Sequence, residues 1–149
     1  MNNPGQRILV IANQTCPCSA LADEVAWRAR GTSADVLVVA PALNSLLRHW
    51  ASDVDAAVAR AEERLNSAVA QLRNRGVNAR GRVGDANPLL AIADALADFP
   101  ATEIVIATHP PGHSHWLERG LIDKAHAQFD LPIAHVVSTY GAAPAAVAA

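Results

Sequence analysis

Two short segments contain the side chains with the strongest metal-binding chemistry in this sequence. Cys16 and Cys18 lie one residue apart, and His109, His113 and His115 follow one another closely near the other end of the chain. Thiolate and imidazole groups together suit Zn²⁺, which binds such ligands at about 2.0–2.3 Å. The alternative is that the histidines lie in solvent or pack over the sheet edge and that the cysteines are small apolar fillers. We favour this alternative and predict no metal site.

A second group of residues could bind an organic ligand. Asp85 and Arg119 could orient a ligand and pair with its anion, and Trp116 could stack on a base. Each has a simpler alternative, because a carboxylate often caps a turn, a surface ion pair contributes about 0–1 kcal/mol, and an aromatic residue often only packs between helix and loop. We interpret Trp27, Trp50 and His49 as structural or interface residues.

The motifs of common enzyme classes are missing from the sequence. It contains no Gly-x-Ser-x-Gly elbow and no glycine-rich loop that ends in Lys-Ser or Lys-Thr. The single lysine, Lys124, falls on the last predicted helix, so a phosphorelay receiver site is also missing. We therefore predict a binding or regulatory module with no catalytic residues, and the alternative is a small-molecule enzyme.

The elements that position these residues alternate between strand and helix. Continuous apolar runs predict strands at 8–12 and 36–40, the second of them stopped by Pro41. Three further strands are predicted at 77–83, 103–107 and 131–137, the first of these closed by Gly84 and Asp85. Helical spacing of apolar residues predicts four helices: one capped by Ser19, one running from Ser52 to Gly76, one opened by Asn87 and Pro88, and one with Leu117, Leu121, Ala125 and Phe129 on one face.

This alternation predicts an α/β fold with a five-stranded parallel sheet. Ligands of such sheets bind in a crevice at the carboxyl ends of the strands, where the winding reverses. If the first and fourth strands are neighbours, the loops that follow them face each other there. The candidate ligand-binding residues lie in and beside the loops after the first four strands, and they are Ala12, Asn13, Ala40, Pro41, Gly84, Asp85, Thr108, His109, Gly112, His113 and Ser114.

Several of these segments together carry a family resemblance. They are the apolar strand ending at Ala12-Asn13, the turn 84–88, and the run 104–109 leading to Gly120 and to Pro132-Ile133. In their order and spacing the chain resembles the universal stress protein family over residues 7–137. The resemblance implies a three-layer, doubly wound sheet with strand order 3-2-1-4-5, of the adenine nucleotide alpha-hydrolase-like type. It also implies a role in the stress response, a nucleotide-binding fold and frequent dimers.

The nucleotide-binding members of that family share a phosphate-binding pattern from which this chain departs. The pattern is Gly, two residues, Gly, nine residues, Gly, then Ser or Thr, and its positions fall here on Ala107, Pro110, Gly120 and Leu121. Gly120 thus joins the candidate ligand-binding residues. Proline offers no N–H to a phosphate, and leucine offers no hydroxyl.

Two further positions depart from the family. Asn13 stands where the family has an Asp, and Pro41 occupies the position that lines the base pocket. We therefore predict impaired ATP binding. Retained binding of ATP or a related adenine nucleotide is the alternative.

Composition narrows the choice of partners. The 149 residues are 51% hydrophobic and carry a net charge of −2, so neither nucleic acid nor an anionic membrane is an expected partner. No apolar run approaches the roughly 20 residues of a membrane helix. The polar start, residues 1–6, lacks the apolar stretch of a secretory signal, so we expect a cytoplasmic protein.

The sequence also indicates domain organisation and assembly. We predict one universal stress protein-like domain over residues 1–139, followed by a mobile alanine-rich tail over 140–149. The last strand is expected at a sheet edge, because Pro132 suits an edge position. An apolar edge strand invites pairing, so we predict a homodimer formed through this strand.

Overall fold

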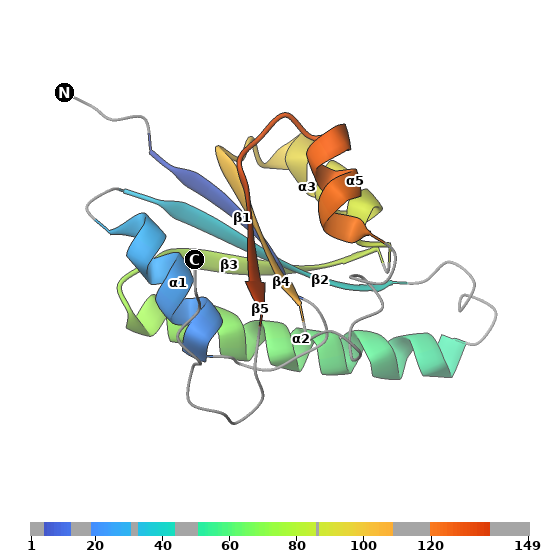
Figure 1. Cartoon of the computed structure of the whole chain (residues 1–149). Helices are drawn as coiled ribbons and strands as arrows, with labels where there is room; N and C mark the ends of the chain where they lie inside the picture. Colours follow the sequence, from blue (N-terminus) through green and yellow to red (C-terminus); the bar gives the residue numbers. More distant parts are fainter. Residues whose placement is uncertain are drawn as a thin grey trace.

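The computed structural model describes residues 5–12, 19–30, 33–43, 51–85, 87–108 and 120–137. They form one five-stranded sheet with the order β3-β2-β1-β4-β5, and every neighbouring pair is parallel (Figure 1). The elements along the chain are β1 (Arg7–Ala12), α1 (Ser19–Ala29), β2 (Asp35–Leu43), α2 (Ala51–Asn74), β3 (Asn78–Asp85), α3 (Pro88–Asp98), β4 (Glu103–Thr108), α5 (Leu121–Gln128) and β5 (Ile133–Val137). The predicted fold class and strand order are confirmed.

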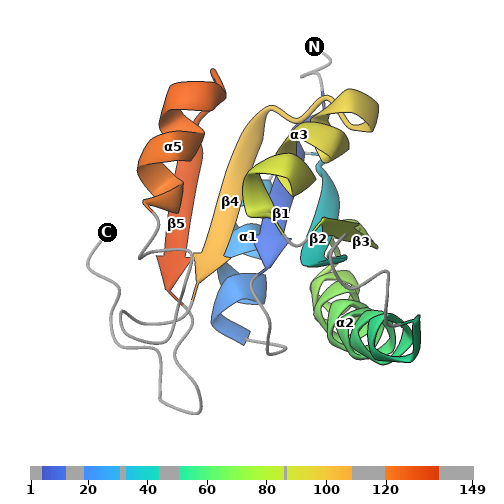
Figure 2. The same cartoon turned by 90° about the vertical axis from the view of Figure 1, so that its right-hand side faces the viewer.

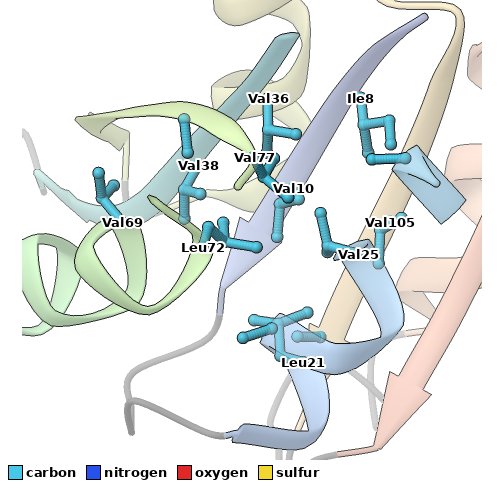
Figure 3. Close-up of a cluster of buried hydrophobic side chains, with 14 of the residues drawn as sticks. Ile8, Val10, Leu21, Val25, Val36, Val38, Val69, Leu72, Val77 and Val105 are labelled. Carbon is cyan, nitrogen blue, oxygen red and sulfur yellow. The ribbon is translucent and has the colours of Figure 1, made fainter. Parts of the chain in front are cut away.

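Helices cover the sheet on both faces, which gives three layers (Figure 1). Ile8 and Val10 of β1 pack under α1 and α2, whereas Leu9 and Ile11 pack under α3 and α5. All four side chains are fully buried, which explains why β1 is apolar at successive positions. Figure 3 shows the first of these two clusters, in which Val25 of α1 lies against the sheet.

Two of the predicted helix boundaries need correction. Ser52 was predicted to cap the second helix, but α2 already begins at Ala51, so Ser52 lies in its first turn. The last helix was predicted to include Leu117, which lies outside the described residues. Gly120 has a φ of 64°, a left-handed conformation that no α-helix passes through, and α5 begins only at Leu121.

The prediction that Pro41 stops the second strand is wrong, because β2 continues to Leu43. In a parallel strand, alternate residues direct their N–H and C=O groups to opposite neighbours. The N–H of Asp35 donates to the carbonyl of Gln6 at 2.9 Å, so Asp35 and every second residue after it, including Pro41, face β1. Pairing with β3 uses the residues in between, and the missing N–H of Pro41 therefore costs this ladder no hydrogen bond.

Side chains tie the elements together at the amino end of the sheet. Glu103 of β4 accepts hydrogen bonds from Gln6 and from Arg28 of α1, the latter at 3.1 Å. Arg28 also pairs with Glu24 at 3.0 Å, and Asn78 donates to Asp35 at 2.6 Å. None of the described helices is both long enough and apolar enough to cross a membrane.

Candidate functional site

The winding of the sheet reverses between β1 and β4, which are hydrogen-bonded neighbours up to the pair Ala12 and Ala107. The chain leaves β1 for α1, which packs on one face, and α5, which follows β4, packs on the other. The helices that follow β1 and β4 thus lie on opposite faces of the sheet, and the carboxyl end of such a strand pair is where open parallel sheets bind ligands. The neighbouring strands on which the site prediction depends are thus present.

Small or main-chain groups dominate the described part of this edge. Ala12 and Gly84 are half-buried, and Ala40 and Pro41 are buried. Pro41 of β2 lies opposite Gly84 of β3, and the register shifts between Pro41 and Leu43. Side chains this small bring the main chain within reach of a ligand.

Gly84 allows α3 to approach the sheet closely. A Cβ atom on Gly84 would lie 2.8 Å from Cγ1 of Val39 and 3.2 Å from Cβ of Ala91, the first of which is shorter than real Cβ contacts. The absence of a side chain at 84 thus fixes the position of α3 at the carboxyl edge. Val39 and Ala91 were not among the predicted site residues, and their signal in the sequence is weak because both look like ordinary core positions.

Asp85 acts as a turn cap, which is the simpler of the two alternatives considered for it. Its Oδ1 accepts from the N–H of Asn87 at 2.8 Å, and Oδ1 of Asn87 accepts from the N–H of Leu89 at 3.0 Å. The predicted cap at Asn87 is confirmed. Since Pro88 has no N–H and Leu89 already donates to Asn87, the start of α3 has few donors left for a ligand.

The start of α5 differs from that of α3. Gly120 precedes the helix in the left-handed conformation and makes no side-chain cap, and its carbonyl accepts from the N–H of Lys124 at 3.0 Å. Leu121 is 3% exposed and packs in the core with α3. The position where the family pattern has a hydroxyl residue is therefore a core position in this chain.

Much of the predicted site lies outside the described residues. This holds for Asn13, His109, Gly112, His113 and Ser114, and for the metal candidates Cys16, Cys18 and His115. Trp116, Arg119, Trp50 and His49 lie outside them as well. Thr108 ends β4 opposite Val137. Within the described ranges no three His, Cys, Asp or Glu side chains gather as a metal site would require.

Trp27 was interpreted as a structural or interface residue. It is 61% exposed on α1, and the guanidinium of Arg30 lies 5.6 Å from the centre of its ring. Its side chain therefore contributes little to the core of this chain.

Comparison with protein-family models and with curated protein sequences finds no match. Solved structures do match. A universal stress protein from Archaeoglobus fulgidus aligns with a TM-score of 0.64 and 20% identity over 88% of this chain and 93% of that one. A structure of the universal stress protein from Archaeoglobus fulgidus in complex with dAMP aligns with a TM-score of 0.64 and 17% identity, over 89% and 97%.

A protein of the universal stress protein family from Burkholderia pseudomallei gives a TM-score of 0.60 and 19% identity, over 88% of this chain and 95% of that one. At identities this low the likeness establishes the fold. This chain has the fold of the universal stress proteins.

Proposed function

We propose that this chain is a regulatory module of the universal stress protein type that binds a small ligand at the carboxyl ends of β1 and β4 and binds ATP poorly. The observation that carries the proposal is the reversal of winding between these two strands. The similar Archaeoglobus fulgidus structure in complex with dAMP supports binding of an adenine nucleotide in this fold. Binding rather than catalysis is proposed because the sequence contains no catalytic motif.

Impaired ATP binding is supported by two positions of the phosphate-binding pattern. Leu121 fills the core under α5, so no hydroxyl is present there to contact a phosphate. Pro110 has no N–H to donate. Both losses remove hydrogen bonds to an anion, for which donors are required.

Retained binding of an adenine nucleotide is a second candidate, and one observation favours it. Gly120 keeps a left-handed conformation directly before α5, which has no side-chain cap. The main-chain N–H groups of Leu121 and Ile122 open the helix without an intrahelical acceptor. A phosphate near these groups would still gain from the helix terminus.

The experiment that separates the two candidates is mass spectrometry of small molecules released from the purified chain by mild denaturation. A compound that is not an adenine nucleotide, present at close to one equivalent, supports the proposed function. ATP or another adenine nucleotide supports the second candidate. Absence of any released molecule, together with no binding in a screen of small metabolites, would contradict both.

We also propose that the partner is a second copy of this chain, joined through β5. This strand lies at one edge of the sheet, beside α5, as Figure 2 shows. It carries no acidic or basic side chain except His135, and burial lowers the pKa of His135, so the edge is uncharged at pH 7. Unprotected edges of this kind favour pairing.

The opposite edge, β3, is protected by arginines. Nε of Arg73 donates to the carbonyl of Ala79 at 2.9 Å, and Arg82 pairs with Asp98 at 3.1 Å. The guanidinium of Arg80 lies 5.6 Å from the centre of the Phe99 ring. Charged side chains at an edge oppose pairing with another strand, so of the two edges β5 is the better interface.

A further inference from the structure

The β1–β2, β1–β4 and β2–β3 ladders do not end at the same level along the strands. Pairing between β1 and β2 ends at Ile11 and Val39, although β1 continues beside β4 to Ala12 and β2 continues beside β3 to Leu43. Two strands that both continue have thus stopped pairing with each other. The next hydrogen bond of the β1–β2 ladder is therefore missing at the carboxyl end of the sheet.

The missing bond can be assigned from the direction of the strands. Asp35 of β2 pairs with Arg7 of β1, and its N–H donates to the carbonyl of Gln6, the residue before Arg7, at 2.9 Å. The same step repeats every second residue, so residue 41 would donate to the carbonyl of Ala12. Residue 41 is proline and has no N–H, so the carbonyl of Ala12 lacks its donor from the sheet.

We infer that Pro41 keeps the carbonyl of Ala12 as a hydrogen-bond acceptor for the ligand, and that the ligand binds there through an amino, amide or other N–H donor. Ala12 is a half-buried residue, and a main-chain carbonyl at such a position is expected to find a partner, which the ladder does not supply. The inference rests on the proposed function, because it assigns one contact within the same site.

The surrounding groups fit a donor better than an acceptor. The carbonyl of Pro41 also faces the β1 side, where β1 has ended. On the β3 side, Asp85 is a carboxylate, and the turn that it caps leads to Pro88, which has no donor. The carbonyl of Pro41 and the carboxylate of Asp85 are both acceptors, and acceptors suit an N–H donor on the ligand.

The test uses the full chain, the variant Pro41→Ala and the control Pro100→Ala, which removes an exposed proline at the other end of the sheet. Adenosine and purine riboside are the probes, since they differ only in the 6-amino donor. Binding is measured at millimolar concentration by shifts of main-chain NMR resonances, which also locate the probe. Hydrogen exchange of the new amide at position 41 is measured without any probe.

In the unaltered chain and in Pro100→Ala we expect adenosine to bind about 3- to 10-fold more tightly than purine riboside, the effect of one hydrogen bond. In Pro41→Ala the new N–H occupies the Ala12 carbonyl, so this preference should disappear and the amide at position 41 should be protected from exchange.

An unprotected amide at position 41 would overturn the inference. So would an equal preference in Pro41→Ala and the control while both probes shift the resonances of Ala12 and Ala40. If neither probe shifts these resonances in any of the proteins, the assigned contact is refuted, whereas the proposed function is contradicted only if the purified chain also releases no small molecule and binds none in the metabolite screen.

Discussion

Replacing Gly84 by alanine should destabilise the chain because of a contact that the structure defines. The new Cβ would lie 2.8 Å from Cγ1 of Val39 and 3.2 Å from Cβ of Ala91, and both neighbours are buried. Overpacking of this kind costs about 1–3 kcal/mol. Alanine regains about 0.5–1 kcal/mol because it loses less main-chain entropy than glycine in a strand. The expected net loss is about 1–2 kcal/mol, or a decrease in Tm of about 2–8 °C for a chain of this size.

The assay is thermal and urea unfolding of Gly84→Ala, Val39→Ala and the double variant. Val39→Ala destabilises the core by itself, because Val39 is 1% exposed. It also removes the methyl group that the new Cβ would meet. The loss of unfolding free energy in the double variant should therefore be smaller than the sum of the two single losses, by about 0.5–1 kcal/mol or more.

Gly76→Ala serves as the control in this series. A Cβ at position 76 would meet nothing within 4 Å, although the φ of 80° still disfavours alanine. Its effect should simply add to that of Val39→Ala. Additive effects of Gly84→Ala and Val39→Ala, or a Gly84→Ala chain as stable as the original, would refute the packing argument for α3.

Three further predictions concern ligands and assembly. ATP at millimolar concentration should raise Tm by less than about 2 °C, whereas binding at about one hundred times Kd would raise it by about 5–10 °C and contradict impaired binding. Light scattering should give the mass of a dimer, and Ile133→Arg on β5 should give a monomer; a monomeric original chain, or a dimer unaffected by this change, contradicts the β5 interface. Zn²⁺ should remain at well below one equivalent after desalting, and a stoichiometric metal that is lost in Cys16→Ser/His113→Ala would show that a site exists.

The sequence alone predicted the elements that depend on a periodic pattern of apolar residues or on residues within one turn. β1 and β4 were predicted from continuous apolar runs, and these runs are buried by helices on both faces. The start of α3 was predicted from Asn87 and Pro88, because the cap needs only residues within one turn. The strand order was an implication of the family resemblance, and the structure confirms it.

The predicted end of the second strand and the predicted start of the last helix were wrong, because neither can be inferred from the local sequence pattern. Whether Pro41 ends β2 depends on which neighbour it faces, and this follows from a register with β1 that is fixed far away at Asp35. The start of α5 depends on the left-handed conformation of Gly120, whereas apolar spacing alone continues back through Leu117. Five of the twelve candidate ligand-binding residues, Asn13, His109, Gly112, His113 and Ser114, lie outside the described residues, so their placement remains a prediction.

The two ends of the sheet differ in how they are held together, and this difference supports placing the site at the carboxyl end. At the amino end, Glu103 is 13% exposed at its side chain and joins β4 to α1 through Arg28. Thr102 and Arg7 also exchange hydrogen bonds there, at 3.0 Å each. Such pairs fix helices and strands with respect to one another, and removing one partner of a half-buried pair leaves the other without compensation.

At the carboxyl end, apart from the turn capped by Asp85 and Asn87, the residues at the ends of β1 and β2 have small or apolar side chains. Ala12, Ala40 and Pro41 make no side-chain hydrogen bonds, because their side chains have no polar atoms. Substitutions of these three residues remove no side-chain hydrogen bond between the layers. A proline at position 41 is such a change, since β2 keeps its ladder with β3 while the carbonyl of Ala12 loses its donor from the sheet. Side-chain pairs therefore join strand and helix at the amino end, whereas position 41 alters only a main-chain acceptor at the carboxyl end.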